Sequence, residues 1–165
     1  NSLNLLAQQF EITSLGRAPA RYSNDQLYKL NSELLSNYDF EKIISLLGDN
    51  KGSFNREFWD CIKHNISNIS EVFEWIRVID EPINIDIDIE YEYLNVAQDL
   101  LPNEPWNIET WDQWILKIKE KTERKGKDLF MPIRLALTGK TKGPELNKLI
   151  LLMGYNKVME RLKRK

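Results

Sequence analysis

The sequence predicts an all-α protein built from two small helical parts. Apolar residues recur every three or four positions in several separate segments, as they do on the buried face of a helix. Several of these segments begin with a Ser, Thr or Asn followed three positions later by an acidic or amide residue, which is a helix start signal. The one strictly alternating run, residues 83–93, has no second strand-like segment to pair with, so we expect an extended connector there.

Three segments carry the clearest start signals, at residues 23–26, 68–71 and 110–113. Each is followed by an apolar stripe at helical spacing, which predicts one buried face per helix. Tryptophans at such spacing are typical of a core rather than of a base-stacking platform. The three stripes are Leu27, Leu30, Leu34 and Leu35; Ile69, Val72, Phe73, Ile76 and Ile79; and Trp111, Trp114, Ile115 and Ile118.

Further helices are expected between and after these segments. One carries Phe58, Trp59, Ile62 and Ile66, and another runs from near Glu90 to a point before Pro102. The helix that begins at Thr110 is expected to end near Gly126, with Lys117, Lys121 and Arg124 on its outer face. Two short helices are expected to begin at Pro132 and Pro144, because proline lacks only an amide that the first turn does not use. Gly139 and Gly154 then supply the closing residues.

The proline-punctuated loop at residues 101–106 is the predicted boundary between two subdomains. Residues 1–100 would form a connector and a first helical subdomain, and residues 101–165 a second. The composition, with 42% hydrophobic and 29% charged residues, suffices for a core without disulfides or metal.

Few residues offer chemistry for catalysis or metal binding. The single cysteine, Cys61, and the single histidine, His64, give no metal-ligand cluster, and a buried, inert thiol is the simpler interpretation of Cys61. The spaced carboxylates Asp86, Asp88, Glu90 and Glu92 are typical of a solvated face. A freestanding enzyme is therefore disfavoured. No stretch approaches the roughly 20 apolar residues of a membrane span, so we expect a soluble, cytoplasmic chain.

The net charge of −2 hides a strong asymmetry along the chain. Residues 117–165 hold 15 Lys and Arg against 5 Asp and Glu, whereas residues 1–116 hold 8 against 20. A basic segment fits a phosphate-binding surface, although on charge alone a solvated lysine-rich helix face with a frayed basic tail is slightly favoured. The basic loop at residues 139–143 leads into a helix N-terminus, where amides and the helix dipole favour an anion. It lacks the full pattern of a nucleotide-binding loop.

Three runs in the second half of the chain read GKDLFMPIRLALTG at residues 126–139, GPEL at 143–146 and LLMG at 151–154. They resemble the signature of the C-terminal domains of bacterial glutamyl-tRNA synthetases. LPNEPWNIETW at 101–111, APARY at 18–22 and Leu30-Asn31 resemble the corresponding parts of that family. Residues 36–95 match more loosely. The HIGH-type and KMSKS-type catalytic signatures are absent, so the chain would begin after both.

The resemblance implies an all-helical anticodon-binding cage of two subdomains, as in class I synthetases. It places Arg134, Gly143, Pro144 and Leu146 beside the first two anticodon bases, with Lys140 and Lys142 as basic neighbours. A guanidinium can donate two parallel hydrogen bonds to a base edge or stack on its face. From the residues alone, a salt bridge between two helices is the simpler interpretation of Arg134.

The family also has an arginine that reads the third anticodon base and separates glutamate from glutamine tRNAs. Asn65 aligns with it, and Lys63 and Arg56 are neighbours that would serve if the alignment shifted. The missing arginine leads to the hypothesis that the parent enzyme also accepts the tRNA for glutamine.

The resemblance thus implies a monomeric, tRNA-binding fragment of a glutamate–tRNA ligase. ATP with magnesium would be used by the absent catalytic domain, and no cofactor is expected in the fragment, which would be inactive alone. The alternative from a different class is a helical protein–protein adaptor with a basic C-terminal face.

Overall fold

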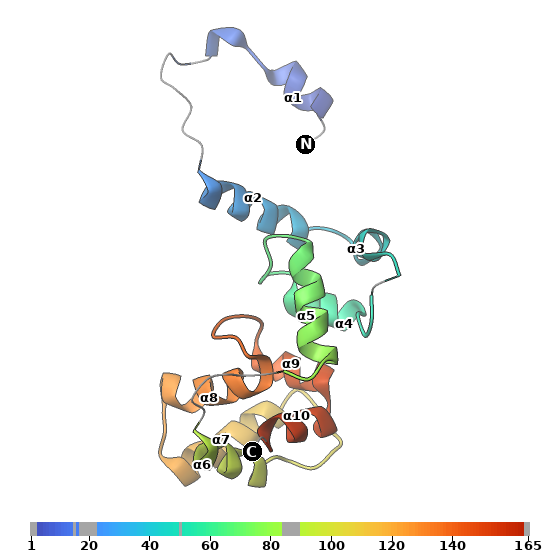
Figure 1. The fold of residues 1–165 in the computed structure, drawn as a ribbon. Helices are drawn as coiled ribbons and strands as arrows, with labels where there is room; N and C mark the ends of the chain where they lie inside the picture. Colours follow the sequence, from blue (N-terminus) through green and yellow to red (C-terminus); the bar gives the residue numbers. More distant parts are fainter. Residues whose placement is uncertain (1–2, 15, 17–22, 50, 84–89, 164–165) are drawn as a thin grey trace.

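The structure is a computed structural model that describes residues 3–14, 16, 23–49, 51–83 and 90–163. These residues form helices and contain no strand, so the predicted all-α fold is confirmed (Figure 1). The helices are α1 (Leu3–Gln9), the 3-10 helix η1 (Ile12–Ser14), α2 (Asn24–Ser36), α3 (Phe40–Leu47), α4 (Arg56–Ile62), α5 (Ser70–Asp80), α6 (Tyr91–Asp99), α7 (Thr110–Thr122), α8 (Gly126–Thr138), α9 (Leu146–Met153) and α10 (Tyr155–Leu162).

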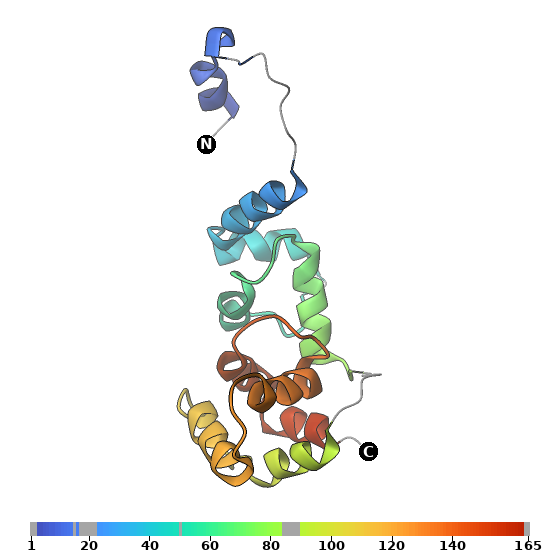
Figure 2. The same ribbon diagram turned by 90° about the vertical axis from the view of Figure 1, so that its left-hand side faces the viewer.

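The helices form an elongated arrangement of two groups. Helices α3, α4 and α5 make the first group, and α6 to α10 make the second, with α2 and then α1 and η1 lying beyond the first (Figures 1 and 2). Helix α9 packs against α4 and so joins the groups. One apolar core runs through both groups and includes the fully buried Phe58, Ile79, Trp114 and Leu149.

Helix α6 belongs by its contacts to the second group. It packs against α7, α8 and α10. The Tyr93 hydroxyl donates to the Leu129 carbonyl at 2.5 Å, and Trp114 Nε1 donates to the Ala97 carbonyl at 2.8 Å. The division between residues 100 and 101 stays a prediction, and these contacts favour a boundary before α6.

A buried arginine near the end of the chain holds the two groups together. Arg161 is 3% exposed, and its Nη1 donates to the Leu137 carbonyl at 2.5 Å. Its Nη2 lies within hydrogen-bond distance of three carbonyls at the end of α5: Val78 at 2.5 Å, Glu81 at 3.1 Å and Ile79 at 3.3 Å. The last carbonyls of a helix have no partner within it, and the helix dipole favours a cation there. Arg161 therefore caps α5 from α10.

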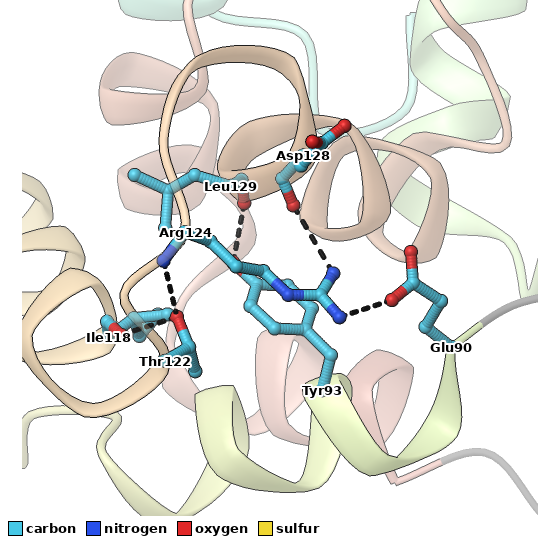
Figure 3. Close-up of polar contacts among 7 residues, drawn as sticks. All are labelled: Glu90, Tyr93, Ile118, Thr122, Arg124, Asp128 and Leu129. Carbon is cyan, nitrogen blue, oxygen red and sulfur yellow. Dashed lines mark hydrogen bonds and ion pairs between the residues drawn. The ribbon is translucent and has the colours of Figure 1, made fainter.

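Pro132 lies inside α8, so the prediction that a helix begins at this residue was wrong. An interior proline cannot donate to the carbonyl four residues earlier, which here belongs to Asp128. Arg124 Nη1 lies 3.4 Å from that carbonyl and replaces part of the lost bond (Figure 3). The Arg124 guanidinium also pairs with Glu90 and lies 4.3 Å from the centre of the Tyr93 ring. Arg124 thus gives the Asp128 carbonyl a partner that the proline cannot supply.

The predicted start signals found the right regions but not the right residues. The Ser23 side chain makes no capping bond at the start of α2. At α5, Glu71 accepts from the backbone and hydroxyl of Ser67, one residue earlier than expected. At α7, Asn107 accepts from the Glu109 amide and donates its own amide to the Thr110 hydroxyl, so the reciprocal pair lies three residues upstream.

The prediction that α2 has a buried stripe was wrong. Leu27, Leu30 and Leu34 are 43%, 52% and 49% exposed, and only Leu35 packs against the core. The spacing of the leucines correctly predicts an apolar helix face, but it does not identify a segment that packs on that face. This face is uncovered in the part of the chain that the structure describes.

The remaining helix boundaries agree with the expectations to within a few residues. Helix α6 starts beside Glu90, as expected, whereas residues 84–89 of the alternating run, with Asp86 and Asp88, lie outside the described residues. Helix α4 ends at Ile62, and Ile66 is buried beyond it. Helix α7 ends at Thr122, before Gly126, and α9 begins two residues after Pro144. Gly139 and Gly154 follow the ends of α8 and α9 as expected.

Cys61 is a buried free thiol, as its interpretation from the sequence proposed. Burial raises its pKa to about 11, while Lys148 opposes the shift. Because the thiolate is the reactive form, the side chain is inert near neutral pH.

We expect Arg161→Met to lower the free energy of unfolding by about 3 kcal/mol. Bonds from a charged donor contribute roughly 1.5–3 kcal/mol, and the substitution leaves buried carbonyls without this donor. Urea unfolding followed by tryptophan fluorescence measures the change. Lys148→Met, which removes an exposed cation paired with Glu145, is the matched control and should leave the midpoint unchanged. Equal midpoints for the two variants would contradict the role of Arg161.

Candidate nucleic-acid interface

The loop between α8 and α9, residues 139–145, lies between the two helix groups and beside α5 (Figures 1 and 2). Helix α8 stops here because Gly139 adopts a left-handed conformation with φ 65°. The buried Thr138 hydroxyl lies 2.7 Å from the Arg134 carbonyl and accepts from the Lys140 amide at 3.1 Å. The Leu-Thr-Gly end of the motif is thus a helix terminus that aims the loop toward α5.

Arg134 joins α8 to this loop. Its Nη2 donates to the Pro144 carbonyl at 3.0 Å, rather than to a carboxylate of the described residues. Its Nη1 is buried without a hydrogen-bond partner among those residues, and burial lowers the pKa of the guanidinium. A guanidinium carries five N–H donors, and the Pro144 carbonyl takes one of them while the buried Nη1 has no acceptor among the described residues. The salt bridge considered from the sequence is not what holds Arg134.

Gly143 lies directly against a tryptophan of the first group. A Cβ at position 143 would lie 2.3 Å from Cη2 of Trp75, and the backbone there has φ +149°. Lys140 pairs with Glu74 at 3.1 Å and lies 5.7 Å from the centre of the Trp75 ring. The loop therefore contacts two consecutive residues of α5.

Pro144 and Leu146 are placed in the interior. Pro144 is buried, and Leu146 is 4% exposed within the core. Neither side chain presents a surface on which a base can stack. Both residues instead shape the backbone of the loop. The Pro144 carbonyl accepts a hydrogen bond from Arg134, and the buried Leu146 fixes the first turn of α9.

The other predicted site residues lie at the junction, where the α8–α9 loop contacts α5, or just after a helix that packs against α9. Lys142 is exposed on the loop. Lys63 and Asn65 follow α4, which packs against α9. The Lys63 ammonium pairs with Asp60 at 2.6 Å, and Asn65 is exposed. The fold thus brings residues from two distant stretches of sequence to neighbouring helices.

Two residues of the junction were missed as site residues in the sequence. Trp75 has the spacing of a core residue in α5, and it is buried, but its contact with Gly143 spans two parts of the chain that no local pattern connects. Thr138 is part of the quoted motif, and its small polar side chain before a glycine was the available signal for a helix end.

The sequence matches the family described as "Anticodon binding domain" over residues 26–165. The chain belongs to this family.

Among curated proteins, the chain is similar to glutamate–tRNA ligase 1 of several bacteria. It is 40% identical over 161 residues to that of Chelativorans sp. (strain BNC1), covering 94% of the chain and 35% of the relative. It is 35% identical over 159 residues to that of Rickettsia bellii, covering 95% and 36%. For Brucella suis biovar 1 the identity is 39% over 162 residues, covering 94% and 35%. The chain spans about a third of the length of these relatives.

A solved structure has the same fold. The glutamate-tRNA synthetase from Elizabethkingia anophelis superimposes with a TM-score of 0.68 at 17% sequence identity, over 93% of this chain and 33% of that one. The described helices are all too short or too polar to cross a membrane.

We expect Gly143→Ala to destabilise the protein by about 1–3 kcal/mol, because the added methyl overlaps the Trp75 ring. In a Trp75→Phe background the same substitution should cost clearly less, because phenylalanine lacks the ring atoms that clash. The unfolding free energies of the two single variants and the double variant, measured with urea, give this coupling. Additive effects would show that the contact does not constrain the loop.

Proposed function

We propose that the chain is the anticodon-binding part of a glutamate–tRNA ligase, placed C-terminal to the catalytic domain, and that its α8–α9 loop contacts the anticodon. The family match over residues 26–165 carries the proposal. The relatives named above are glutamate–tRNA ligases, and the chain matches a third of their length. The whole enzyme would attach glutamate to its tRNA with ATP and magnesium. We assign no contact with ATP, magnesium or glutamate to the described residues.

Arg134 is the residue we propose for base contact. It is only partly exposed, it is fixed by Pro144, and most of its donors remain uncommitted. A fixed guanidinium can bind a base edge without first losing side-chain freedom. We propose that Gly143, Pro144 and Leu146 act through the backbone shape of the loop, since the last two side chains are buried.

Lys140 and Lys142 are proposed to contact phosphates of the anticodon loop. Lys142 is exposed on the loop, whereas Lys140 must first exchange its partner Glu74 for a phosphate. Exposed ion pairs of this kind contribute little to stability, so the exchange is inexpensive. The protein is proposed to act as a monomer in the cytoplasm.

A second candidate function is supported by α2. Its exposed leucines, Leu27, Leu30 and Leu34, form an apolar face, and the first part of the chain is strongly acidic. This arrangement suits a helical adaptor that binds another protein. The adaptor predicts partner binding that is insensitive to Arg134 and to the lysines of the α8–α9 loop, whereas tRNA binding depends on both.

We expect Arg134→Ala to weaken binding of the tRNA for glutamate about ten-fold or more, as removal of a base-contacting arginine costs about 1–3 kcal/mol. Lys142→Ala should instead lower the slope of affinity against salt by about 0.7–0.9, because one counterion fewer is released. Fluorescence anisotropy with labelled tRNA over a salt series measures both. Lys29→Ala, on α2, is the control for charge alone. Affinity unchanged by Arg134→Ala would contradict the proposed contact.

Asn65 is proposed to take the position that a discriminating arginine has in the family. The neighbouring Lys63 forms an ion pair with Asp60. We therefore expect the full-length enzyme to charge the tRNA for glutamine as well as that for glutamate. Asn65→Arg should favour the glutamate tRNA about ten-fold, the order expected for one added base contact. Aminoacylation rates with the two tRNAs test this, and complete rejection of the glutamine tRNA by the unaltered enzyme would contradict it.

A further inference from the structure

An open groove lies between α7 and the first turns of α8, away from the α8–α9 loop. It is mainly apolar and is lined by Trp111, Leu116 and Phe130, with Lys119 and Lys125 beside them. The Trp111 and Phe130 rings are nearly parallel, 22° apart, with centroids separated by 6.3 Å. Phe130 is 39% exposed and Leu116 is 55% exposed. An aromatic pair thus meets solvent next to two cations.

Phe130 is aligned with the proposed anticodon contact along α8. Lys127, Phe130 and Arg134 are spaced by three and four residues, so they share one face of the helix. Phe130 and Arg134 lie one turn apart, about 6 Å along the helix axis. Consecutive nucleotides of an unstacked strand span such a step. The stripe then leads to Lys140 and the α8–α9 loop.

Phe130 is not part of the buried core. Trp114, on the inner face of α7, is fully buried and uses its indole N–H within the protein. Trp111 is half-buried, contacts Trp114 edge-on and stacks against the Phe130 ring. A base that stacks on Phe130 extends this aromatic series, and stacking on an aromatic ring is the usual way in which proteins bind unpaired bases.

The charges beside the groove favour a nucleic acid over an apolar peptide. Lys119 and Lys125 line it and are exposed, Lys127 is exposed in the first turn of α8, and Asp112 is the one carboxylate among the described lining residues. A base occupies an aromatic surface while its phosphate remains outside, where these lysines lie. An apolar peptide would leave the same cations without partners.

We propose that Phe130, packed on Trp111, stacks on an unpaired base of the anticodon loop, next to the anticodon itself. Lys119 and Lys125 contact the phosphate adjoining that base. The proposal rests on the proposed function and extends it. The RNA would then follow α8 from the α8–α9 loop to the groove, so that two separated contacts fix the register of the loop.

The experiment compares Phe130→Leu, which keeps an apolar side chain, with Phe130→Tyr, which keeps the ring. Binding of the full chain to a labelled anticodon stem-loop of the glutamate tRNA is measured by anisotropy. We expect Phe130→Leu to weaken binding about ten-fold and Phe130→Tyr to bind within two-fold of the unaltered chain, because stacking contributes about 1–3 kcal/mol per base. Urea unfolding of each variant verifies that it folds.

A set of stem-loops, each with one loop base removed, locates the stacked base. With one of these RNAs the difference between the unaltered chain and Phe130→Leu should disappear, whereas Arg134→Ala should still weaken binding. If Phe130→Leu binds every RNA like the unaltered chain while Arg134→Ala does not, the stacking proposal is overturned and the proposed function stands. A uniform loss with every RNA would also overturn it. Absence of any effect of Arg134→Ala would overturn both.

Discussion

The hydrogen bonds of Arg161 are the interaction on which the arrangement of the molecule depends. One guanidinium from α10 reaches carbonyls at the end of α5 and a carbonyl of α8. Helix α5 carries Trp75, and α8 carries Arg134, so the position of the α8–α9 loop follows from a cation buried behind it. The interface is therefore set from within the core, by a residue that is not itself exposed to a ligand.

Folding brings the acidic and the basic parts of the sequence into contact. Residues of the acidic part pair with residues of the basic part, Glu74 with Lys140 and Glu90 with Arg124. Part of the opposite charge is thus paired within the fold, and each pair is exposed enough to be screened by water and salt. Lysines that make no ion pair with a described residue include Lys117, Lys119, Lys121, Lys125 and Lys127, on α7 and at the start of α8, so cations are dense at that end of the molecule.

The sequence predicted the helices better than it predicted their partners. Helices α5 and α7 follow from apolar spacing, and Trp114 is buried as that spacing requires. The leucines of α2 have equally good spacing but are exposed, because amphipathicity does not identify what covers a face. Among the candidate site residues that the resemblance places beside the anticodon bases, Pro144 and Leu146 have buried side chains. The backbone of Gly143 lies against the Trp75 ring. Neither that contact nor the role of Arg161 has a local signature, since both join segments that are distant in the chain.

The proline inside α8 couples the residue types that suit positions 132 and 124. Pro132 takes away the amide partner of the Asp128 carbonyl, and Arg124 compensates from the preceding loop. A descendant with an ordinary residue at position 132 would regain the helical bond and release position 124 from this requirement. A descendant that lost Arg124 first would leave the exposed Asp128 carbonyl to water until the proline also changed. Replacement of the proline before the arginine therefore keeps a protein partner on this carbonyl at every step.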